Sequence, residues 1–287
     1  MTRFALIGAT GRVGRLVTNA WRSTPGPWTN TPIQTRDLTG PASATHIPWD
    51  VAQGPGALQD WMDVFGPLSC LIVLAGTTPA TGTDMNDNVA LAQRYVQAAH
   101  DLGIPRVLIA SSSAVYGSGS GSPLAETDPC APLNAYGASK QMMEQALQAY
   151  PMADGNLCCL RIGNVLGADA LLLNAAKGGP VVLDIFANGH GPLRSYIGPG
   201  DLAHVLGHLA TMPHPLPFTL NIAAPTPVYM DALANAADLH WTARPAPETA
   251  VQNLTLDCHR LTQYVALSDT ASDPTFLIED WKRHRGQ

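Results

Sequence analysis

Short apolar runs bounded by turn-forming residues recur along the first part of the chain. They are FALIG at 4–8, PIQT at 32–35, CLIVLAG at 70–76, RVLIASSS at 106–113 and LCCLRIGN at 157–164. Continuous apolar runs without alternating polar residues are typical of strands that are buried on both faces. The pattern therefore predicts the strands of a parallel sheet.

Segments with apolar residues at helical spacing lie between these runs. They cover 11–21, 86–103 and 134–150, and a further helix and strand are predicted at 201–212 and 218–224. A strand followed by a helix, repeated along the chain, is the order of a Rossmann-type, doubly wound α/β fold. We therefore expect this fold class, with a parallel sheet at its centre.

The regular pattern loosens after about residue 165, where Gly- and Pro-rich stretches become frequent. We predict a dinucleotide-binding Rossmann domain over 1–165, to which 201–224 returns. A small, irregular substrate-covering region is predicted over 166–287. The terminal WKRHRGQ, 281–287, is expected to be a solvated tail.

Composition narrows the class of protein. Of 287 residues, 46% are apolar and 13% are charged, which describes a compact globular chain rather than a disordered one. The net charge is −6 and no basic run occurs, which argues against nucleic acid as a partner because such binding depends on neutralising phosphates. The apolar run before Gly8 is too short for a signal peptide or a membrane span, and no later run reaches about 18 residues.

Cysteine and histidine spacing argues against a metal site. The five cysteines show no CxxC or zinc-like spacing, which suits buried thiols in a reducing compartment. We therefore expect a cytoplasmic protein and, since no apolar run is long enough to span a bilayer, one that does not bind membranes. His204 and His208 stand four residues apart, a spacing that can bind metal, but the sequence offers no evident third ligand. We therefore predict no metal.

A glycine-rich loop, GATGRVG, follows the first predicted strand and opens the first predicted helix. Glycine permits a tight turn and lets backbone N–H groups approach a pyrophosphate, whose charge then meets the positive end of the helix dipole. The alternative is a strand–helix turn that binds nothing. The loop predicts a dinucleotide cofactor, and these residues are the candidates to bind it: Gly8, Thr10, Gly11, Arg12, Val13 and Gly14.

The choice between NAD and NADP depends on the residues after the second predicted strand. An acidic residue there would bind the ribose 2′-hydroxyl of NAD, whereas an arginine would bind the 2′-phosphate of NADP. Both types occur side by side, as Arg36 and Asp37. We favour NADP because Arg36 comes first.

NAYGASK at 134–140 places Tyr136 four residues before Lys140, on one face of a predicted helix. A free tyrosine has a pKa of about 10, and a fixed ammonium together with a nicotinamide cation would lower this pKa toward neutral pH. Tyr136 could then exchange a proton with a substrate oxygen while a hydride moves, and a serine of ASSSAVYG at 110–117 would hold that oxygen. The alternative is an exposed helical pair worth a few tenths of a kcal/mol.

Three motifs occur in one order along the chain: GxxGxxG at 8–14, SSSAVYG at 111–117 and YxxxK at 136–140. In this combination the chain resembles the extended short-chain dehydrogenase/reductase family, and within it the NAD-dependent epimerase/dehydratase group. The resemblance implies the Rossmann core and an NAD or NADP cofactor. Relatives commonly form dimers through the helices that match 86–103 and 134–150, so a homodimer is an expectation.

The resemblance also implies roles for single residues. Tyr136 would be the acid/base, and Lys140 would bind the nicotinamide ribose and lower the tyrosine pKa. Ser112 would be the catalytic serine, with Ser113 as the alternative, and both would lie at the substrate. Further contacts to the cofactor would come from residues beyond the glycine loop: Asp50, Val51, Leu74, Ala75, Gly76 and Asn88.

Departures from the family pattern narrow the reaction. The sugar-nucleotide 4,6-dehydratases of the family carry an Asp-Glu pair beside the active serine or threonine, where this chain has Ser113 and Ala114. The fucose-type epimerase/reductases carry a cysteine at the position of Ala114. This leaves hydride transfer of the 4-epimerase type, or a simple dehydrogenase/reductase reaction, on a sugar-like substrate.

Two later segments resemble UDP-galactose 4-epimerases, which act on a nucleotide sugar. RIGNVLGA places Asn164, and RSYIGPGDLA places Arg194, where those enzymes contact the diphosphate, and Arg244 resembles a second such arginine. The planar fork of arginine suits a diphosphate because it donates two parallel hydrogen bonds. In the alternative reading, Asn164 caps a turn and Arg194 pairs with Asp201.

Two other functions stay open. Only 29 residues separate Asn164 from Arg194, fewer than in those epimerases, which leaves room for a smaller, non-nucleotide carbonyl substrate. The second is a non-catalytic NAD(P)-binding sensor protein. Such sensors often lack the tyrosine or the lysine of the YxxxK motif, and both are present here.

Overall fold

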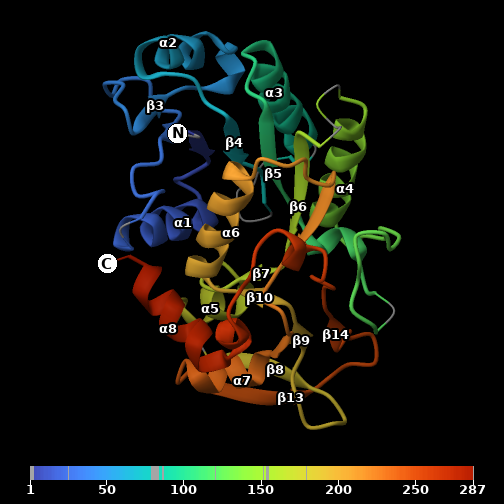
Figure 1. The fold of residues 1–287 in the computed structure, drawn as a ribbon. Helices are drawn as coiled ribbons and strands as arrows, with labels where there is room; N and C mark the ends of the chain where they lie inside the picture. Colours follow the sequence, from blue (N-terminus) through green and yellow to red (C-terminus); the bar gives the residue numbers. More distant parts are fainter. Residues whose placement is uncertain are drawn as a thin grey trace.

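The computed structural model describes residues 3–24, 26–78, 84, 85, 87–119, 121–150, 152, 155–178 and 180–286. Within this part of the chain a seven-stranded sheet runs through the centre, in the order β11-β6-β5-β4-β1-β2-β3 (Figure 1). The strands are β1 Phe4–Ile7, β2 Ile33–Thr35, β3 His46–Pro48, β4 Cys70–Val73, β5 Arg106–Ser112, β6 Leu157–Ile162 and β11 Thr219–Ile222. Every neighbouring pair is parallel, which confirms the predicted Rossmann-type α/β fold.

In the described part of the chain, six helices cover the sheet: α1 Arg12–Ser23, α2 Gly56–Phe65, α3 Asp87–Asp101, α4 Ala135–Gln148, α6 Pro199–Thr211 and α8 Pro274–His284. Four of them, α1, α3, α4 and α6, begin and end close to their predicted bounds, whereas α2 and α8 were not predicted. Asn86, the predicted start of the third helix, lies outside the described residues. The pattern missed β3, which has three residues and buries one of them, and α2, which buries only Leu58 and Trp61.

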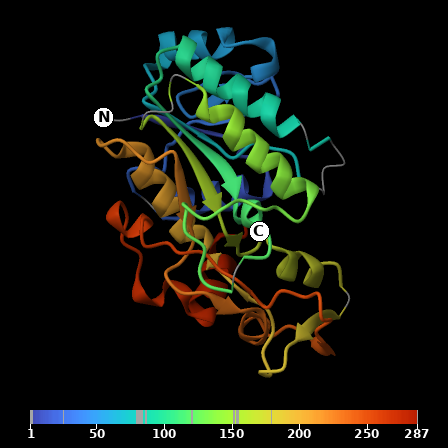
Figure 2. The ribbon, with the colours of Figure 1, turned by 90° about the vertical axis from the view of Figure 1, so that its right-hand side faces the viewer.

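The sheet separates two apolar cores. Successive strand residues face opposite sides of a sheet, so Leu6 joins the cluster that includes residues of α1 and α6, and Ile7 joins the cluster that includes residues of α2, α3 and α4. Figure 2 shows α3 and α4 in front of the strands, on one side of the sheet. Burial on both faces explains why the strand sequences are apolar throughout rather than alternating.

A smaller set of elements lies below the sheet in Figures 1 and 2 and has a core of its own. It holds short strand pairs and two short helices: β7 Asn164–Val165, α5 Ala170–Ala175, β8 Val181–Ile185, β9 Leu193–Arg194, β10 Tyr196–Ile197, β12 Val228–Tyr229, α7 Met230–Ala236, β13 Trp241–Pro245 and β14 Asn253–Leu254. Because β11 belongs to the central sheet, the chain passes from the upper part to the lower part more than once. The division at residue 165 stays a prediction.

The C-terminal end corrects the expectation of a solvated tail. Helix α8 extends to His284, whose side chain is only 3% exposed. His284 Nδ1 lies 2.9 Å from Ser23 Oγ, its Nε2 lies 3.3 Å from Asp280 Oδ1, and its carbonyl accepts a bond from Asn19. The basic residues obscured an amphipathic helix whose apolar side packs inward. Among the described residues, no helix has both the length and the apolar character that a membrane-spanning helix requires.

Candidate active site

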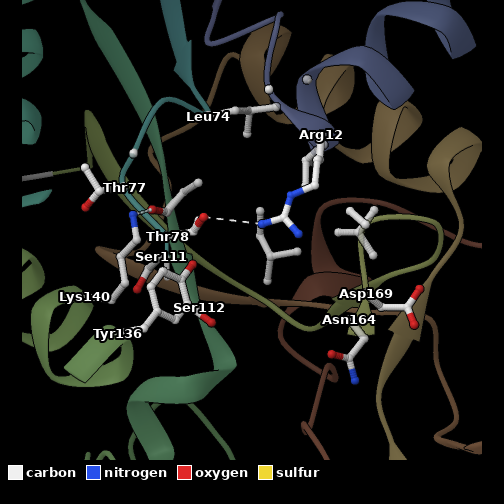
Figure 3. Close-up of a pocket in the computed structure, with 18 of the residues that line it drawn as sticks. Arg12, Leu74, Thr77, Thr78, Ser111, Ser112, Tyr136, Lys140, Asn164 and Asp169 are labelled. Atoms are coloured by element: carbon white, nitrogen blue, oxygen red, sulfur yellow. Dashed lines mark hydrogen bonds between the residues drawn. The ribbon is translucent and has the colours of Figure 1, made fainter. Parts of the chain in front are cut away.

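A cavity of about 660 Å³ opens at the carboxyl ends of the central strands (Figure 3). Parallel sheets bind ligands at this end, and small-molecule sites commonly measure about 300–1,000 Å³. Its walls come from the loops after β1 and β4, from the end of β5, from α1 and α4, and from the segment after β6. The residues that line it include Thr10, Gly11, Arg12, Val13, Gly14, Leu74, Gly76, Thr78, Ser111, Ser112, Tyr136, Lys140, Asn164 and Asp169.

The glycine loop is tight for reasons that the structure makes explicit. Gly8 has φ +82°, a left-handed conformation, and a Cβ placed on it would lie 2.5 Å from the backbone nitrogen of Ala75. A Cβ on Gly14 would overlap the carbonyl oxygen of Gly8. A side chain at either position would therefore force β1, β4 and α1 apart.

The N-terminus of α1 faces the cavity and suits a pyrophosphate. Helix α1 begins after Gly11, and in the described residues no side chain caps it. The first-turn N–H groups of a helix lack intrahelical partners, and the helix dipole makes this end positive. Thr10 to Gly14 all line the cavity, and Arg12 adds a guanidinium that donates to Thr78 Oγ1 at 3.3 Å. These residues fit the diphosphate of a dinucleotide.

The loop after β4 is held by a buried asparagine. Leu74 and Gly76 line the cavity, whereas Ala75 packs against Gly8. Asn88 is 2% exposed, and its amide both accepts from the backbone N–H of Thr77 at 2.9 Å and donates to the Thr77 carbonyl at 3.1 Å. Asn88 therefore supports this wall of the cavity from behind rather than lining it.

Tyr136 and Lys140 lie on one face of α4 and both line the cavity (Figure 3). The helix starts there because the Asn134 side chain accepts from the N–H of Gly137 at 2.8 Å and caps it. Lys140 is 4% exposed, and its Nζ donates to the carbonyl of Ala110 at 2.8 Å. The spacing of four residues thus brings a phenol and an ammonium to one site, as the sequence predicted.

The pKa values of the pair respond mainly to burial. Burial raises the pKa of Tyr136, and a hydrogen bond with Ser112 and the charge of Arg12 oppose this rise. Burial lowers the pKa of Lys140 to about 8. Both shifts favour the uncharged forms, as expected when water is removed from an ionisable group. That Lys140 and a cofactor cation lower the tyrosine pKa stays a prediction.

The three consecutive serines occupy different environments. Ser111 and Ser112 line the cavity, and Ser112 Oγ also accepts from the N–H of Ala114 at 3.1 Å. Ser113 opens the short helix η3 Ser113–Tyr116 and does not line the cavity. The sequence motifs pointed to no role for Ser111, although it stands in the same run.

The substrate side of the cavity contains Asn164 but neither predicted arginine. Arg194 donates to three backbone carbonyls, those of Leu193, Val251 and Gln252, at 2.8, 2.9 and 2.5 Å. Burial lowers the pKa of Arg194. Arg194 does not pair with Asp201 in the described structure, and its Nη1 and Nη2 donate to these carbonyls instead.

Arg244 is exposed and pairs with Asp184 at 2.6 Å, on the two-stranded sheet of β8 and β13. It does not line the cavity. Asp169, to which no sequence motif pointed, does line it, and its carboxylate caps α5 by accepting from the backbone N–H groups of Leu171 and Leu172. Its position directly before an apolar run was the local signal for such a cap.

Four residues that the sequence linked to the cofactor lie outside the cavity lining. Arg36 and Asp37 are exposed, and the Asp37 carboxylate accepts from Thr39 at 2.9 and 2.7 Å, which holds the pKa of Asp37 below its usual value. Asp50 caps the short helix η1 Val51–Gln53, and Val51 is buried. None of these four lines the cavity.

The described residues contain no group of three or more metal-ligating side chains. His204 and His208 contact the ring of Trp28 instead, with ring centroids 5.9 and 5.1 Å away.

Comparison with known proteins shows the family that most of the chain matches. Residues 5–213 match the model of the NAD dependent epimerase/dehydratase family. A UDP-glucose 4-epimerase of Azospirillum brasilense is 40% identical over 84 residues, which are 29% of this chain and 24% of that enzyme. One from Lactobacillus helveticus is 35% identical over 86 residues, 30% of this chain and 26% of that enzyme. The aligned stretch thus spans about a quarter of the length of these curated relatives.

Solved structures resemble the chain over nearly its whole length. The UDP-glucose 4-epimerase of Thermus thermophilus in complex with NAD has a TM-score of 0.70 at 18% identity, with 98% of this chain and 99% of that chain covered. The enzyme of Stenotrophomonas maltophila, with bound NAD and formylated UDP-arabinopyranose, has a TM-score of 0.75 at 16% identity, with 99% and 98% covered. At these identities the likeness concerns the fold.

Proposed function

Because this chain belongs to the NAD dependent epimerase/dehydratase family, we propose that it is an NAD-dependent enzyme that transfers a hydride at a carbinol or carbonyl carbon of a sugar or nucleotide sugar. One observation carries the proposal. A single cavity joins the uncapped start of α1 to Ser112, Tyr136 and Lys140. Such a cavity can hold a dinucleotide and a substrate carbon side by side.

The chain's own residues supply binding and proton transfer. NAD, when bound, supplies the ring that accepts and returns the hydride. The N–H groups at the start of α1 would bind its diphosphate, with Arg12 close by. Tyr136 Oη would take the proton from the substrate hydroxyl and return it, and Ser112 Oγ would donate a hydrogen bond to the same oxygen.

Electrostatics explain how Tyr136 could lose its proton. Burial raises its pKa, so the phenolate forms only when charges oppose burial. The guanidinium of Arg12, the hydroxyl of Ser112 and the ammonium of Lys140 all line the same cavity and would stabilise the phenolate. Lys140 must be protonated to do so, and its pKa of about 8 keeps it mostly charged at neutral pH.

We propose NAD rather than NADP. The preference for NADP rested on Arg36, and the comparisons do not support it, since the family is described as NAD dependent and the structural neighbours named above contain NAD. Arg36 is exposed and lies outside the cavity lining. Direct comparison of the dissociation constants of NAD and NADP, for the wild type and Arg36→Ala, tests the choice.

A second candidate substrate is a smaller, non-nucleotide sugar or carbonyl compound. One observation favours it: neither arginine predicted to hold a diphosphate faces the cavity. Arg194 is committed to three backbone carbonyls and Arg244 to Asp184. A panel of UDP-sugars and free sugars, assayed with added NAD, separates the two candidates.

Tyr136→Phe tests the chemistry. The variant keeps the ring and removes the proton-exchanging oxygen, so we expect normal NAD affinity and a loss of turnover of about 10²–10⁴-fold, the usual contribution of a positioned acid/base. Unchanged turnover would contradict the mechanism. If the wild type binds NAD but turns over nothing on the panel, and NAD instead alters binding to a protein partner, the sensor alternative holds.

The cofactor state of the freshly purified protein separates the two reaction types. We would denature the protein and identify any released dinucleotide by chromatography. Stoichiometric NAD indicates a cofactor that is recycled in place, as a 4-epimerase requires. A protein without dinucleotide that then binds added NAD reversibly indicates a dehydrogenase or reductase.

We also propose a homodimer that forms through α3 and α4. These helices pack side by side on one face of the sheet, and Met142 on α4 is 50% exposed. Size-exclusion chromatography with light scattering tests this, and Met142→Glu should shift a dimer toward monomer.

A further inference from the structure

Ser111 lines the cavity, yet its hydroxyl proton is directed away from it. Its Oγ lies 2.5 Å from Glu144 Oε1, and both side chains are buried, with 4% and 5% exposed. An ionised carboxylate can only accept hydrogen bonds. Ser111 must therefore be the donor, and only the lone pairs of its oxygen remain for the cavity.

The carboxylate of Glu144 is held in place by Arg161. Arg161 Nε lies 3.1 and 3.2 Å from the two carboxylate oxygens, and Nη2 donates to Oε2 at 2.7 Å. Arg161 is 6% exposed, and the charge and hydrogen bonds of Glu144 raise its pKa against the effect of burial. The arginine side chain can only donate hydrogen bonds, so the Glu144 carboxylate remains the acceptor in its bonds with Arg161.

The far side of Arg161 is fixed as well. Its Nη1 donates to Tyr116 Oη at 2.9 Å, and Tyr116 Oη donates to Asn221 Oδ1 at 2.7 Å. The guanidinium also lies over the Tyr116 ring, 4.8 Å from its centroid. A fully satisfied, buried polar network of this kind is rigid. The direction of the Ser111 hydrogen bond is therefore set by groups that lie outside the cavity.

We propose that Ser111 is a specificity residue that accepts a hydrogen bond from a donor group of the bound ligand, and that Glu144 is the positioning residue that fixes this polarity. The donor is an O–H or N–H group, and it has two possible sources: the carboxamide of the cofactor or a hydroxyl of the substrate. The inference rests on the proposed function. It distinguishes Ser111 from Ser112, which lies beside Tyr136 in the same wall and whose hydroxyl would donate to the substrate oxygen.

The chemical consequence is selection against acceptors. A ligand that presents a carbonyl or ether oxygen to Ser111 would face lone pairs and gain no hydrogen bond. A site built to pair with a donor discriminates strongly against analogues that lack it, because its polar group is then left unpaired.

The experiment is a double-mutant cycle of Ser111→Ala, Glu144→Gln and the double variant, with the exposed Ser118→Ala as control. In Glu144→Gln, Arg161 would keep the amide oxygen and turn the amide N–H₂ toward Ser111, which reverses the Ser111 hydrogen bond. Each protein is titrated with NAD and with its 3-acetylpyridine analogue, which lacks the carboxamide N–H. Values of KM and kcat are then measured on the sugar substrate found by the panel.

We expect Ser111→Ala to weaken the binding of one ligand by about 3- to 10-fold, the usual effect of one neutral hydrogen bond. If the donor is the carboxamide, the wild type prefers NAD over the analogue and Ser111→Ala loses this preference. If the donor is a substrate hydroxyl, KM rises and NAD affinity does not change. Glu144→Gln should have an effect at least as large alone, and none beyond about twofold in the Ser111→Ala background.

Two results would overturn the inference. If the wild type binds NAD and turns over substrate while Ser111→Ala equals it in both, Ser111 accepts nothing and only this inference fails. If the wild type binds neither NAD nor any sugar, the proposed function fails and the inference with it. An additive effect of Glu144→Gln would assign that residue to structure alone. Should this variant not fold, Ser111→Ala still decides, because it leaves the Glu144–Arg161 pair intact.

Discussion

Replacing Lys140 by methionine should abolish turnover and yet stabilise the fold. The Lys140 ammonium is buried, with the carbonyl of Ala110 at 2.8 Å and Met143 Sδ at 3.8 Å as its contacts among the described residues. Methionine retains the length and apolar body of the side chain and removes the charge. A residue that is kept at a cost in stability is typical of a functional site.

The magnitude follows from the pKa of Lys140. Burial lowers this pKa from 10.5 to about 8, and at about 1.4 kcal/mol for each pH unit this corresponds to roughly 3 kcal/mol of cost for the charged form at neutral pH. Loss of the hydrogen bond to Ala110 offsets about 1–2 kcal/mol of the stability gained by removing the charge. We therefore expect Lys140→Met to raise the free energy of unfolding by about 1–2 kcal/mol, and the Tm by about 2–3 °C.

The sign of the pH dependence provides a sharper test. Between about pH 8 and 10.5 the unfolded chain binds the proton that native Lys140 has lost, so the stability of the wild type rises with pH over this window. The methionine variant lacks this rise. The excess stability of the methionine variant over the wild type should therefore be largest below pH 8, shrink above pH 8 and reverse toward pH 10.

Urea denaturation at pH 7 and pH 9.5 measures both quantities. The matched control is Lys177→Met, an exposed lysine whose replacement should change stability by no more than about 0.5 kcal/mol at either pH. A Lys140→Met variant that is less stable than the wild type at pH 7, or a stability difference that does not depend on pH, would refute the cost assigned to the buried ammonium.

Three further predictions address the fold. Gly8→Ala combines a left-handed φ with a Cβ that lies 2.5 Å from a backbone atom, so it should lower the free energy of unfolding by about 3 kcal/mol or more and weaken NAD binding. Gly54→Ala, at φ +86° in open space, should lower it by only about 1 kcal/mol, and equal losses of stability in thermal denaturation would contradict this. Arg161→Met leaves Glu144 buried without its cation and should lower the free energy of unfolding by about 3–5 kcal/mol. A double variant in which apolar residues replace both Arg161 and Glu144 should lose less, and chemical denaturation of the single and double variants checks which is the less stable. Burial and a neighbouring carboxylate raise the pKa of Asp201 to about 6, so native protein loses stability as pH rises from about 4 to 6, and Asp201→Asn should remove this loss and be about 1 kcal/mol more stable at pH 7; a variant with an unchanged pH profile of unfolding would contradict it.

Local physical chemistry determined much of this protein from its sequence. The apolar runs predicted the central strands because a strand buried on both faces has no polar positions. The glycine loop was predictable because only glycine adopts φ +82° at Gly8 without strain. Tyr136 and Lys140 were predictable as a pair because four residues make about one helical turn, whatever the rest of the fold does.

Tertiary structure alone decided which polar groups face the cavity. Arg194 matches a motif, yet its guanidinium is bound by carbonyls more than fifty residues away in sequence, at 251 and 252. Ser111 presents only lone pairs because Glu144 and Arg161 come to it from α4 and β6. His284, in a basic segment, is buried against α1. Contacts between residues far apart in the chain leave no periodic signal in the sequence, so the direction of a side chain, and with it the chemistry of the site, emerges only when the elements pack.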